Sequence, residues 1–395
     1  MKDFCYFRKL KTSLCTLILF FTSVFAFSQK SNLEIKFIKG NIEEKKQAVL
    51  QSVADKDGKL SVRALNFCLD SKSILGNDAE LDSLVKESLE CLLKSDFSET
   101  ETLSEIFASL FNNFDSDEIR VKILECLRKF PSSANVALVN DFVSKRMQSA
   151  EPMDEVLLEA IRGLEFYGNF SSFNLLFIAD ILNVWPEYEE DIANSYGSLS
   201  ANSESEILHI FSAVPIDKKI SIIKKLNKNQ KISLKIRGEV AENALSQSIK
   251  YTGENADLNA EYSAEELELL KVALNTISLT KWTRASSLVN EYFQIARVQY
   301  EKGSLSSNDF SQIIQDVACV ASSETDRILA EYLDFLNKST EQDQTPDMNV
   351  VLSVINALGD LGDKLAFDYL LYVTYLDYPE EISSAARVAL AKLKW

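Results

Sequence analysis

Glu206 and His209 have the spacing of a metal-binding helix. A Glu-x-x-His segment places both side chains on one helix face, which ferritin-like di-iron proteins use in two copies together with two further glutamates. His209 is the single histidine among 395 residues, so sites that need a second imidazole cannot be completed. We therefore predict a partly exposed His209 on an amphipathic helix, with no metal bound.

Neighbouring carboxylates could supply a general acid and a general base. They stand at Glu43 and Glu44, at 189–191 and at 265–268. These places read as helix starts, where acidic side chains interact favourably with the helix dipole, and Ser263 to Glu266 has the pattern of a capping box. The sequence contains no glycine-rich phosphate loop, nucleophile elbow or calcium-binding loop. We expect no enzymatic activity, no cofactor and no metal.

The four cysteines after residue 28 all lie in apolar, helix-like patterns, and none forms a Cys-x-x-Cys pair. A chain of this length buries a core without disulfides, and a free cysteine in such a place behaves as a small apolar residue. We expect free, buried thiols at Cys68, Cys91, Cys126 and Cys319.

The N-terminus has the layout of a secretory signal peptide. Basic residues among the first eleven precede an uncharged stretch over 14–27, which ends in small residues at Ala26 and Ser28. The stretch is shorter than the roughly 20 residues that span a bilayer. We predict a signal peptide over 1–28 and export to the bacterial periplasm or beyond; an uncleaved signal that tethers the protein to the membrane is the alternative. Residues 29–40 read as a flexible leader, with a short edge strand over 33–37 as the other possibility.

The charge balance argues against nucleic acid as a partner. The chain has 42 Lys and Arg against 59 Asp and Glu, a net charge of −17, whereas phosphate binding needs a cationic surface. One segment departs from this background: eight cations and one acid lie between Asp217 and Arg237. This basic segment is either a solvated face beside the protein's own acidic residues or a docking site for an anionic partner. Its cations are Lys218, Lys219, Lys224, Lys225, Lys228, Lys231, Lys235 and Arg237.

Composition and periodicity indicate an all-α fold. Gly and Pro number only 11 and 6, and from residue 41 apolar residues recur at spacings of three and four. Helix pairs recur at intervals that average about 38 residues, with the least regular stretches at 187–262 and 339–346. A last helix over 380–393 stands alone. First helices are predicted to begin near Asn41, Asp78, Ser116, Met153, Glu187, Ile216, Ser263, Ser307 and Asp347.

Aligned positions support the repeat. Residues 354–363 match 160–169 in their apolar sites, in a glycine suited to a left-handed C-cap (Gly362 and Gly168) and in a residue that can cap the next helix (Asp363 and Asn169). Residues 349–392, with Ala357-Leu-Gly-Asp-Leu-Gly-Asp and Ser384-Ala-Ala-Arg-Val-Ala-Leu, resemble a HEAT repeat of the bacterial, phycobilin-lyase-like type. The resemblance is good over about 44 residues and fair over 117–184. It implies an α-solenoid that binds or scaffolds, although Ser383 stands where the family commonly has the arginine of an inter-repeat ladder.

Aromatic residues recur along single helix faces. Phe107, Phe111 and Phe114 are expected in the core. Tyr372, Tyr375 and Tyr378 are the best candidates for an exposed binding stripe, because Leu370 and its neighbours already supply core residues.

Together these features predict an all-α, right-handed α-solenoid of about nine HEAT-like helix pairs over 41–395. Stacked pairs share one continuous core that a single pair cannot form. The expected function is that of an exported, non-enzymatic scaffold, a monomer in itself, which binds a protein partner on its concave face or basic segment. The alternatives are a carboxylate-based cell-envelope enzyme on a helical toroid and a membrane-tethered accessory subunit.

Overall fold

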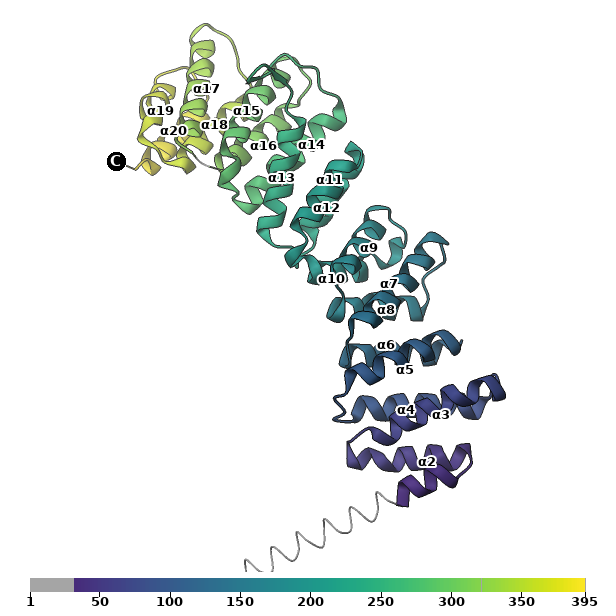
Figure 1. The fold of residues 1–395 in the computed structure, drawn as a ribbon. Coiled ribbons are helices and arrows are strands. Elements are labelled where there is room, and N and C mark those ends of the chain that lie inside the picture. Colours follow the sequence, from purple (N-terminus) through teal and green to yellow (C-terminus); the bar gives the residue numbers. More distant parts are fainter. Residues whose placement is uncertain (1–31, 321, 395) are drawn as a thin grey trace, which may run out of the picture. The chain divides into compact units, whose positions relative to one another are not determined.

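The computed structural model describes residues 32–320 and 322–394, and this part of the chain is almost entirely helical (Figure 1). Apart from helices, turns and loops, the described residues contain a parallel bridge between Asp363 and Lys394 and a short antiparallel hairpin of β1 (Tyr251–Thr252) and β2 (Asn255–Ala256). The prediction of an all-α fold is confirmed. None of the helices described is both long and apolar enough to cross a bilayer. The predicted signal peptide over 1–28 lies outside the described residues.

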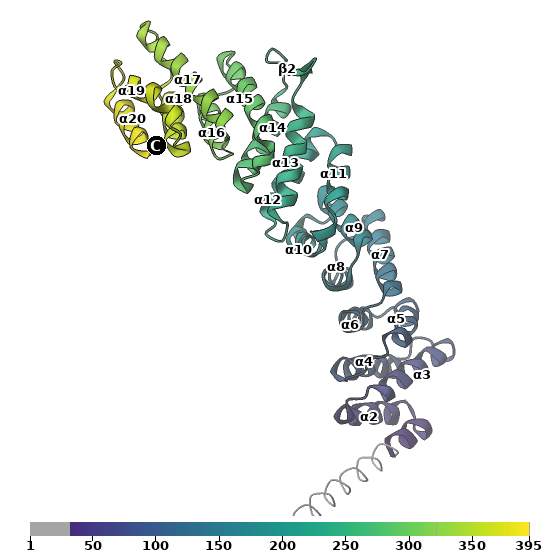
Figure 2. The ribbon, with the colours of Figure 1, turned by 60° about the vertical axis from the view of Figure 1, so that its left-hand side comes forward.

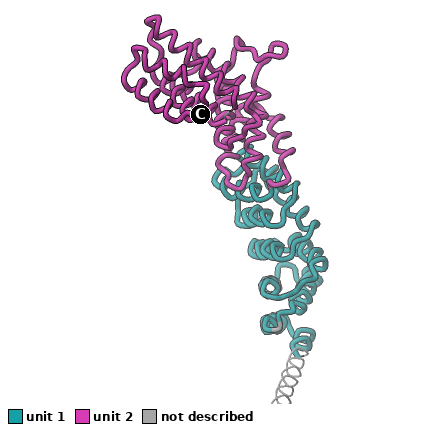
Figure 3. The backbone as a smooth tube through the Cα atoms, turned by 90° about the vertical axis from the view of Figure 1, so that its left-hand side faces the viewer, with its two compact units in different colours: residues 1–199 teal, residues 200–395 magenta. Residues whose placement is uncertain are grey.

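The chain divides into two compact units, residues 1–199 and 200–395 (Figure 3). The first begins with a helix over 32–39 and continues with α2 (Ile42–Ser52), α3 (Lys59–Leu75), α4 (Ala79–Lys94), α5 (Thr100–Asn113), α6 (Asp117–Lys129), α7 (Ser133–Gln148), α8 (Glu155–Tyr167), α9 (Phe170–Ile181) and α10 (Glu189–Leu199).

The second unit contains α11 (Glu204–Ala213), α12 (Ile216–Lys228), α13 (Leu234–Ser248), α14 (Ala264–Thr280), α15 (Ser286–Glu301), α16 (Ser307–Ala318), α17 (Ser323–Glu341), α18 (Met348–Leu361), α19 (Phe367–Val373) and α20 (Glu380–Lys392). Short 3-10 helices lie between some of the α-helices of both units: η1 (Val53–Asp55), η2 (Pro186–Tyr188), η3 (Ser200–Asn202), η4 (Thr283–Ala285) and η5 (Lys364–Ala366).

Within each unit the helices pack in two rows, which the labels in Figures 1 and 2 allow the reader to follow. In the first unit α2, α4, α6, α8 and α10 contact one another in succession, and α3, α5, α7 and α9 do the same. The second unit repeats this plan, with α12 to α20 in one row and α11 to α19 in the other. We call these the even row and the odd row. Successive helices of the even row contact one another more extensively than those of the odd row.

Local capping explains where the helices begin. All nine predicted first helices start within two residues of the observed even-row helices. Asn41 accepts a hydrogen bond from the Glu44 amide, and Ser263 forms the predicted capping box with Glu266. Such side chains satisfy amide groups that the first helical turn leaves without partners. Asp363 and Asn169 also cap as predicted.

The glycine prediction holds at one of its two positions. Gly362 has a φ of 73°, in the left-handed region, and ends α18 as a C-cap. Gly168 ends α8 with a φ of −61°, which any residue can adopt, so the prediction of a left-handed cap there is wrong.

The most extensive hairpin contacts pair an odd helix with the even helix that follows it, as in α3–α4, α9–α10 and α13–α14. The predicted pairs were an even helix with the odd helix after it, so the repeat is offset by one helix. In consequence α20 does not stand alone, because it packs on both α19 and α18.

Because each even-row helix pairs with the helix before it, α2 also has a helical partner, which precedes it in the sequence. Residues 32–39 are helical, with Leu33 and Phe37 buried and Ile35 exposed. The buried Lys45 of α2 donates hydrogen bonds from Nζ to the carbonyl oxygens of Phe37 (2.6 Å) and Gly40 (2.9 Å). The prediction of a flexible leader or edge strand is therefore wrong for these residues.

The apolar residues between the rows form the core, which includes the predicted Phe107, Phe111 and Phe114. The four cysteines within the described residues are free. Cys68, Cys91 and Cys126 are buried, and burial raises the pKa of Cys68 to about 12 and that of Cys91 to about 11. Cys319 is exposed at the C-terminal end of α16, so the prediction of a buried thiol is wrong there.

Candidate partner-binding surfaces

The predicted basic segment covers α12, the following loop and the start of α13. Several of its cations pair with residues of the same unit. Lys224 Nζ lies 3.0 Å from Glu268 Oε1 of α14, and Lys235 Nζ lies 2.5 Å from Glu204 Oε2 of α11. These contacts place acidic partners from the neighbouring helices of each row beside the segment.

Most of the other cations of the segment are also engaged within the chain. Lys219 Nζ donates to Gln247 Oε1 at 2.8 Å, and Arg237 Nη2 donates to the Asn229 carbonyl at 2.6 Å. Burial lowers the pKa of both groups. Lys225, Lys228 and Lys231 have interactions of this kind as well, and Lys218 is half-buried on α12. This pattern favours a face neutralised within the chain over a free cationic docking site.

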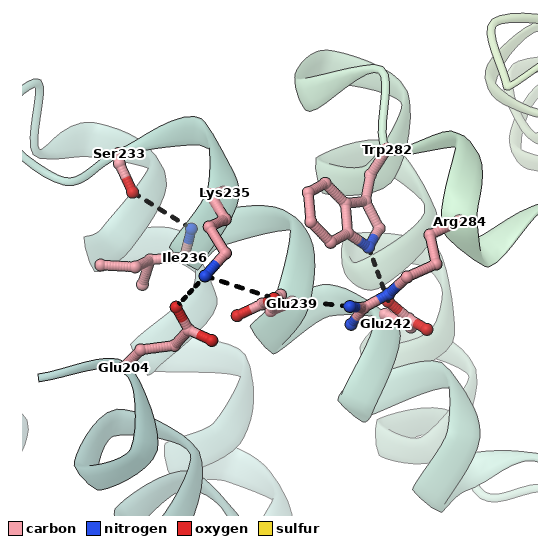
Figure 4. A network of polar contacts seen from close by, with 8 residues as sticks. All are labelled: Glu204, Ser233, Lys235, Ile236, Glu239, Glu242, Trp282 and Arg284. Carbon is pink, nitrogen blue, oxygen red and sulfur yellow. Dashed lines mark hydrogen bonds and ion pairs between the residues drawn. The ribbon is translucent and has the colours of Figure 1, made fainter.

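A carboxyl cluster joins the basic segment to η4 (Figure 4). We use this name for Glu204, Glu239 and Glu242 with the two cations between them, Lys235 and Arg284. Glu239 is 7% exposed; Lys235 Nζ lies 3.9 Å and Arg284 Nη1 3.6 Å from its Oε1. Burial, followed by the adjacent Glu204 carboxylate, raises the pKa of Glu239, whereas hydrogen bonds from Glu239 and Lys235 lower the pKa of Glu204.

Trp282 contacts the carboxyl cluster at Glu242. Trp282 Nε1 donates to Glu242 Oε2 at 2.6 Å, and Arg284 Nε donates to the same oxygen at 2.8 Å. The indole ring lies so close to Gly238 that a Cβ there would meet it at 2.6 Å. The cluster thus connects α11, α13 and η4 through contacts of its carboxylates.

Replacing Glu242 with leucine should destabilise the second unit by about 1–2 kcal/mol, because the indole N–H would lose its acceptor in a partly buried place. Glu242→Gln keeps a carbonyl oxygen for Trp282 and should cost less than half as much. Urea unfolding of the two variants, followed by tryptophan fluorescence, measures the difference. Equal losses would show that charge, not the hydrogen bond, matters at this position.

Ion pairs connect successive helices of the even row, which sequence reasoning did not find. Arg128 of α6 lies 2.5 Å from Glu159 of α8, and Arg162 of α8 lies 2.8 Å from Asp191 of α10. The row also contains Lys86–Glu118, Lys122–Glu90, Lys224–Glu268, Lys271–Asp309 and Lys392–Asp360. Because Ser383 stands where the HEAT-like pattern commonly has an arginine, the sequence put an inter-repeat charge ladder in doubt; other residue pairs form the ion pairs between these helices.

The tyrosine stripe is exposed only in part. Tyr375 is 76% and Tyr372 37% exposed, but Tyr378 is 7% exposed and its hydroxyl donates to Asn337 Oδ1 at 3.3 Å. The prediction is wrong for Tyr378, because the chain turns back onto α17 after α19. Phe335 of α17, which sequence reasoning missed, is 46% exposed beside Arg297. We call Phe335, Tyr372 and Tyr375 the aromatic surface, since Phe335 lies on α17 and the two tyrosines lie in and just after α19, which packs on α17.

His209 is exposed on α11, as predicted. Among residues 32–320 and 322–394, no three side chains of His, Cys, Asp or Glu are grouped so as to hold a metal ion.

The comparisons with known proteins assign no family to the chain. No protein-family model matches the chain, and no curated protein matches it either.

Proposed function

We propose that this chain is a right-handed α-solenoid of HEAT-like helix pairs, about nine in number, and an exported, non-enzymatic scaffold for a protein partner. The observation that carries the proposal is the two-row packing in each unit, in which every even-row helix contacts the next. Repeat proteins with this plan contact only their neighbours and offer long surfaces for binding.

The difference between the rows supports an inner and an outer face. Helices on the inside of a curved stack lie closer together, and here the even row has the more extensive contacts. The even row would then line the concave face, where the ladder of ion pairs fixes its polar side chains. Such a face favours a partner recognised by polar contacts and charge.

The aromatic surface is the place where we expect contact with a partner first. Aromatic side chains are enriched at protein interfaces, and Tyr375 is 76% and Phe335 46% exposed. The basic segment comes second, because most of its cations already have partners within the chain.

A photo-crosslinking side chain at position 375, introduced into the full chain in its native envelope, should capture one discrete protein partner. The control carries the same group at Ile74, which is 83% exposed in the first unit. Capture at 375 and not at 74, lost when Phe335 and Tyr372 are changed to serine, supports the scaffold. Equal capture at both positions, or none at either, contradicts binding through the aromatic surface.

The enzyme alternative has less support. Glu204 and Glu239 are the adjacent carboxyl groups most suited to acid–base work, but Lys235 and Arg284 pair with Glu239 and hold it in a structural contact. Export and a retained membrane tether both depend on residues 1–28, outside the described part, and remain proposals from the sequence.

A further inference from the structure

A groove with a volume of about 510 Å³ lies between α15 and α17 of the odd row. Its lining is mixed: serines, an asparagine and a glutamine stand beside glutamates and one arginine. We call it the α15–α17 groove. It shares no residue with the aromatic surface, the basic segment or the carboxyl cluster.

Asn290 of α15 presents a fixed hydrogen-bonding group to this groove. The side chain is only 6% exposed, and its Oδ1 accepts a hydrogen bond from Thr325 Oγ1 at 2.9 Å. No hydrogen bond from its Nδ2 occurs within the described residues, and Asn290 lines the groove. An amide nitrogen without a protein partner needs water or a ligand in the groove to accept its hydrogens.

Hydroxyl groups surround that amide. The Thr325 hydroxyl donates to Asn290 Oδ1, so in the 2.9 Å contact between Ser322 Oγ and Thr325 Oγ1 the Ser322 hydroxyl is the donor. Ser322 Oγ also accepts a hydrogen bond from the Thr325 backbone amide at 3.2 Å. The amide nitrogen is left for the groove.

Gln294 lies one helical turn further along α15 and also lines the groove. Residues four apart on a helix rise by about 6 Å. An extended polypeptide repeats its outward-facing carbonyl and amide groups every two residues, about 6.6–6.8 Å. Two carboxamides at this spacing therefore match the main chain of an extended peptide.

The charges of the lining indicate which side chains the peptide carries. Glu291, Glu324 and Glu331 stand against Arg327 alone. Arg327 is already bound to two of these glutamates, at 2.5 Å from Glu324 and 2.6 Å from Glu331. The surplus of negative charge favours lysine or arginine.

We infer that the α15–α17 groove binds an extended peptide segment with basic side chains, whose main chain pairs with the carboxamides of Asn290 and Gln294. This inference rests on the proposed binding function and gives its partner a chemical class.

A groove between α3 and α5 provides a matched control. It has a volume of about 500 Å³ and is lined by Asn66, Glu101 and Glu105, so it repeats the combination of an asparagine with glutamates. Asn66, however, is exposed and its Nδ2 already donates to the Val62 carbonyl of its own helix at 3.2 Å. The same types of side chain are present without the fixed, unpaired amide.

The test uses fluorescence anisotropy of the full chain with a labelled seven-residue peptide of alternating lysine and threonine. We expect saturable binding with a dissociation constant below about 1 mM. Gln294→Ala and Asn290→Ala should each weaken it about 3- to 10-fold, the effect of one lost hydrogen bond, whereas Asn66→Ala should leave it unchanged. Because Asn290 is buried, Gln294→Ala keeps the test decisive if the Asn290 variant folds poorly.

Three results would overturn the inference: no binding of the peptide, equal losses in the Asn66 and Gln294 variants, or full competition by spermidine at equal charge, which would mean attraction by charge alone. Any of these, together with successful crosslinking at position 375, would reject the groove and leave the scaffold proposal standing.

Discussion

Gly359→Val should destabilise the second unit by about 2–3 kcal/mol, and Gly359→Ala by about 1–2 kcal/mol. Gly359 lies where α18 crosses α20, and a Cβ there would meet both the Cα and the Cβ of Ala389 at 2.9 Å. A backbone atom cannot turn aside as a side chain does, so the two helices would have to separate. Alanine would gain about 1 kcal/mol of helix propensity over glycine, and we expect the steric cost to exceed that gain.

Gly163→Ala is the matched control, because it is the same substitution inside a buried helix. The Cβ at 163 would meet the hydroxyl end of the Tyr167 side chain at 2.6 Å, and none of its three nearest neighbours is a backbone atom. The expected change in the free energy of unfolding is within about 0.5 kcal/mol of zero or slightly stabilising. Chemical denaturation of both variants measures the contrast; a Gly359→Ala protein as stable as wild type would show that α18 and α20 do not approach this closely.

The helix starts were predictable because the signals are local. A capping side chain such as Asn41 or Asp347 and the first apolar residues after it lie within one turn of each other. The segment 32–39 shows the limit of this method. Leu33, Ile35 and Phe37 alternate like a strand, yet Leu33 and Phe37 are also four apart, and the helix buries these two while Ile35 is 48% exposed. Two periods fit so short a run, and packing against α2 selects one.

The candidate sites were harder to predict because their partners are distant in the sequence. Lys224 meets Glu268 and Asn290 meets Thr325 only after successive helices of a row come together. A count of cations therefore located the basic segment but not the acids that neutralise it. Tyr378 illustrates the same limit, since the turn after α19 returns it to Asn337, 41 residues earlier.

One buried carboxyl group, that of Asp326, should make the protein less stable as the pH rises, whereas carboxyl groups with a lowered pKa have the opposite effect. Asp326 of α17 is 7% exposed and its Oδ1 has no hydrogen-bond partner within the described residues. Burial, and then the nearby Asp363 carboxylate, raises the pKa of Asp326 to about 6 from 3.8. The folded state thus binds the proton more tightly than the unfolded state. The contribution of this group to the free energy of unfolding therefore falls as the pH rises from about 4 to 6.

Asp326→Asn should therefore stabilise the second unit at pH 8 by on the order of 1–3 kcal/mol, since one pKa unit corresponds to about 1.4 kcal/mol. At pH 4, where the wild-type carboxyl is protonated in the folded state, the two proteins should be nearly equally stable. Chemical denaturation at pH 4, 6 and 8 measures the trend, and hydrogen exchange in α17 locates it.

Asp309→Asn provides the control of opposite sign in the same unit. Its hydrogen bonds with Ser306 and Lys271 lower the pKa of Asp309, so the folded state favours the ionised form, and stability from this group is lost as pH falls through the folded pKa. The asparagine variant should be less stable than wild type at pH 8, with the difference shrinking in acid. If both variants shifted stability in the same direction at pH 8, removal of negative charge from an acidic protein would explain the effect, and the burial of Asp326 would not.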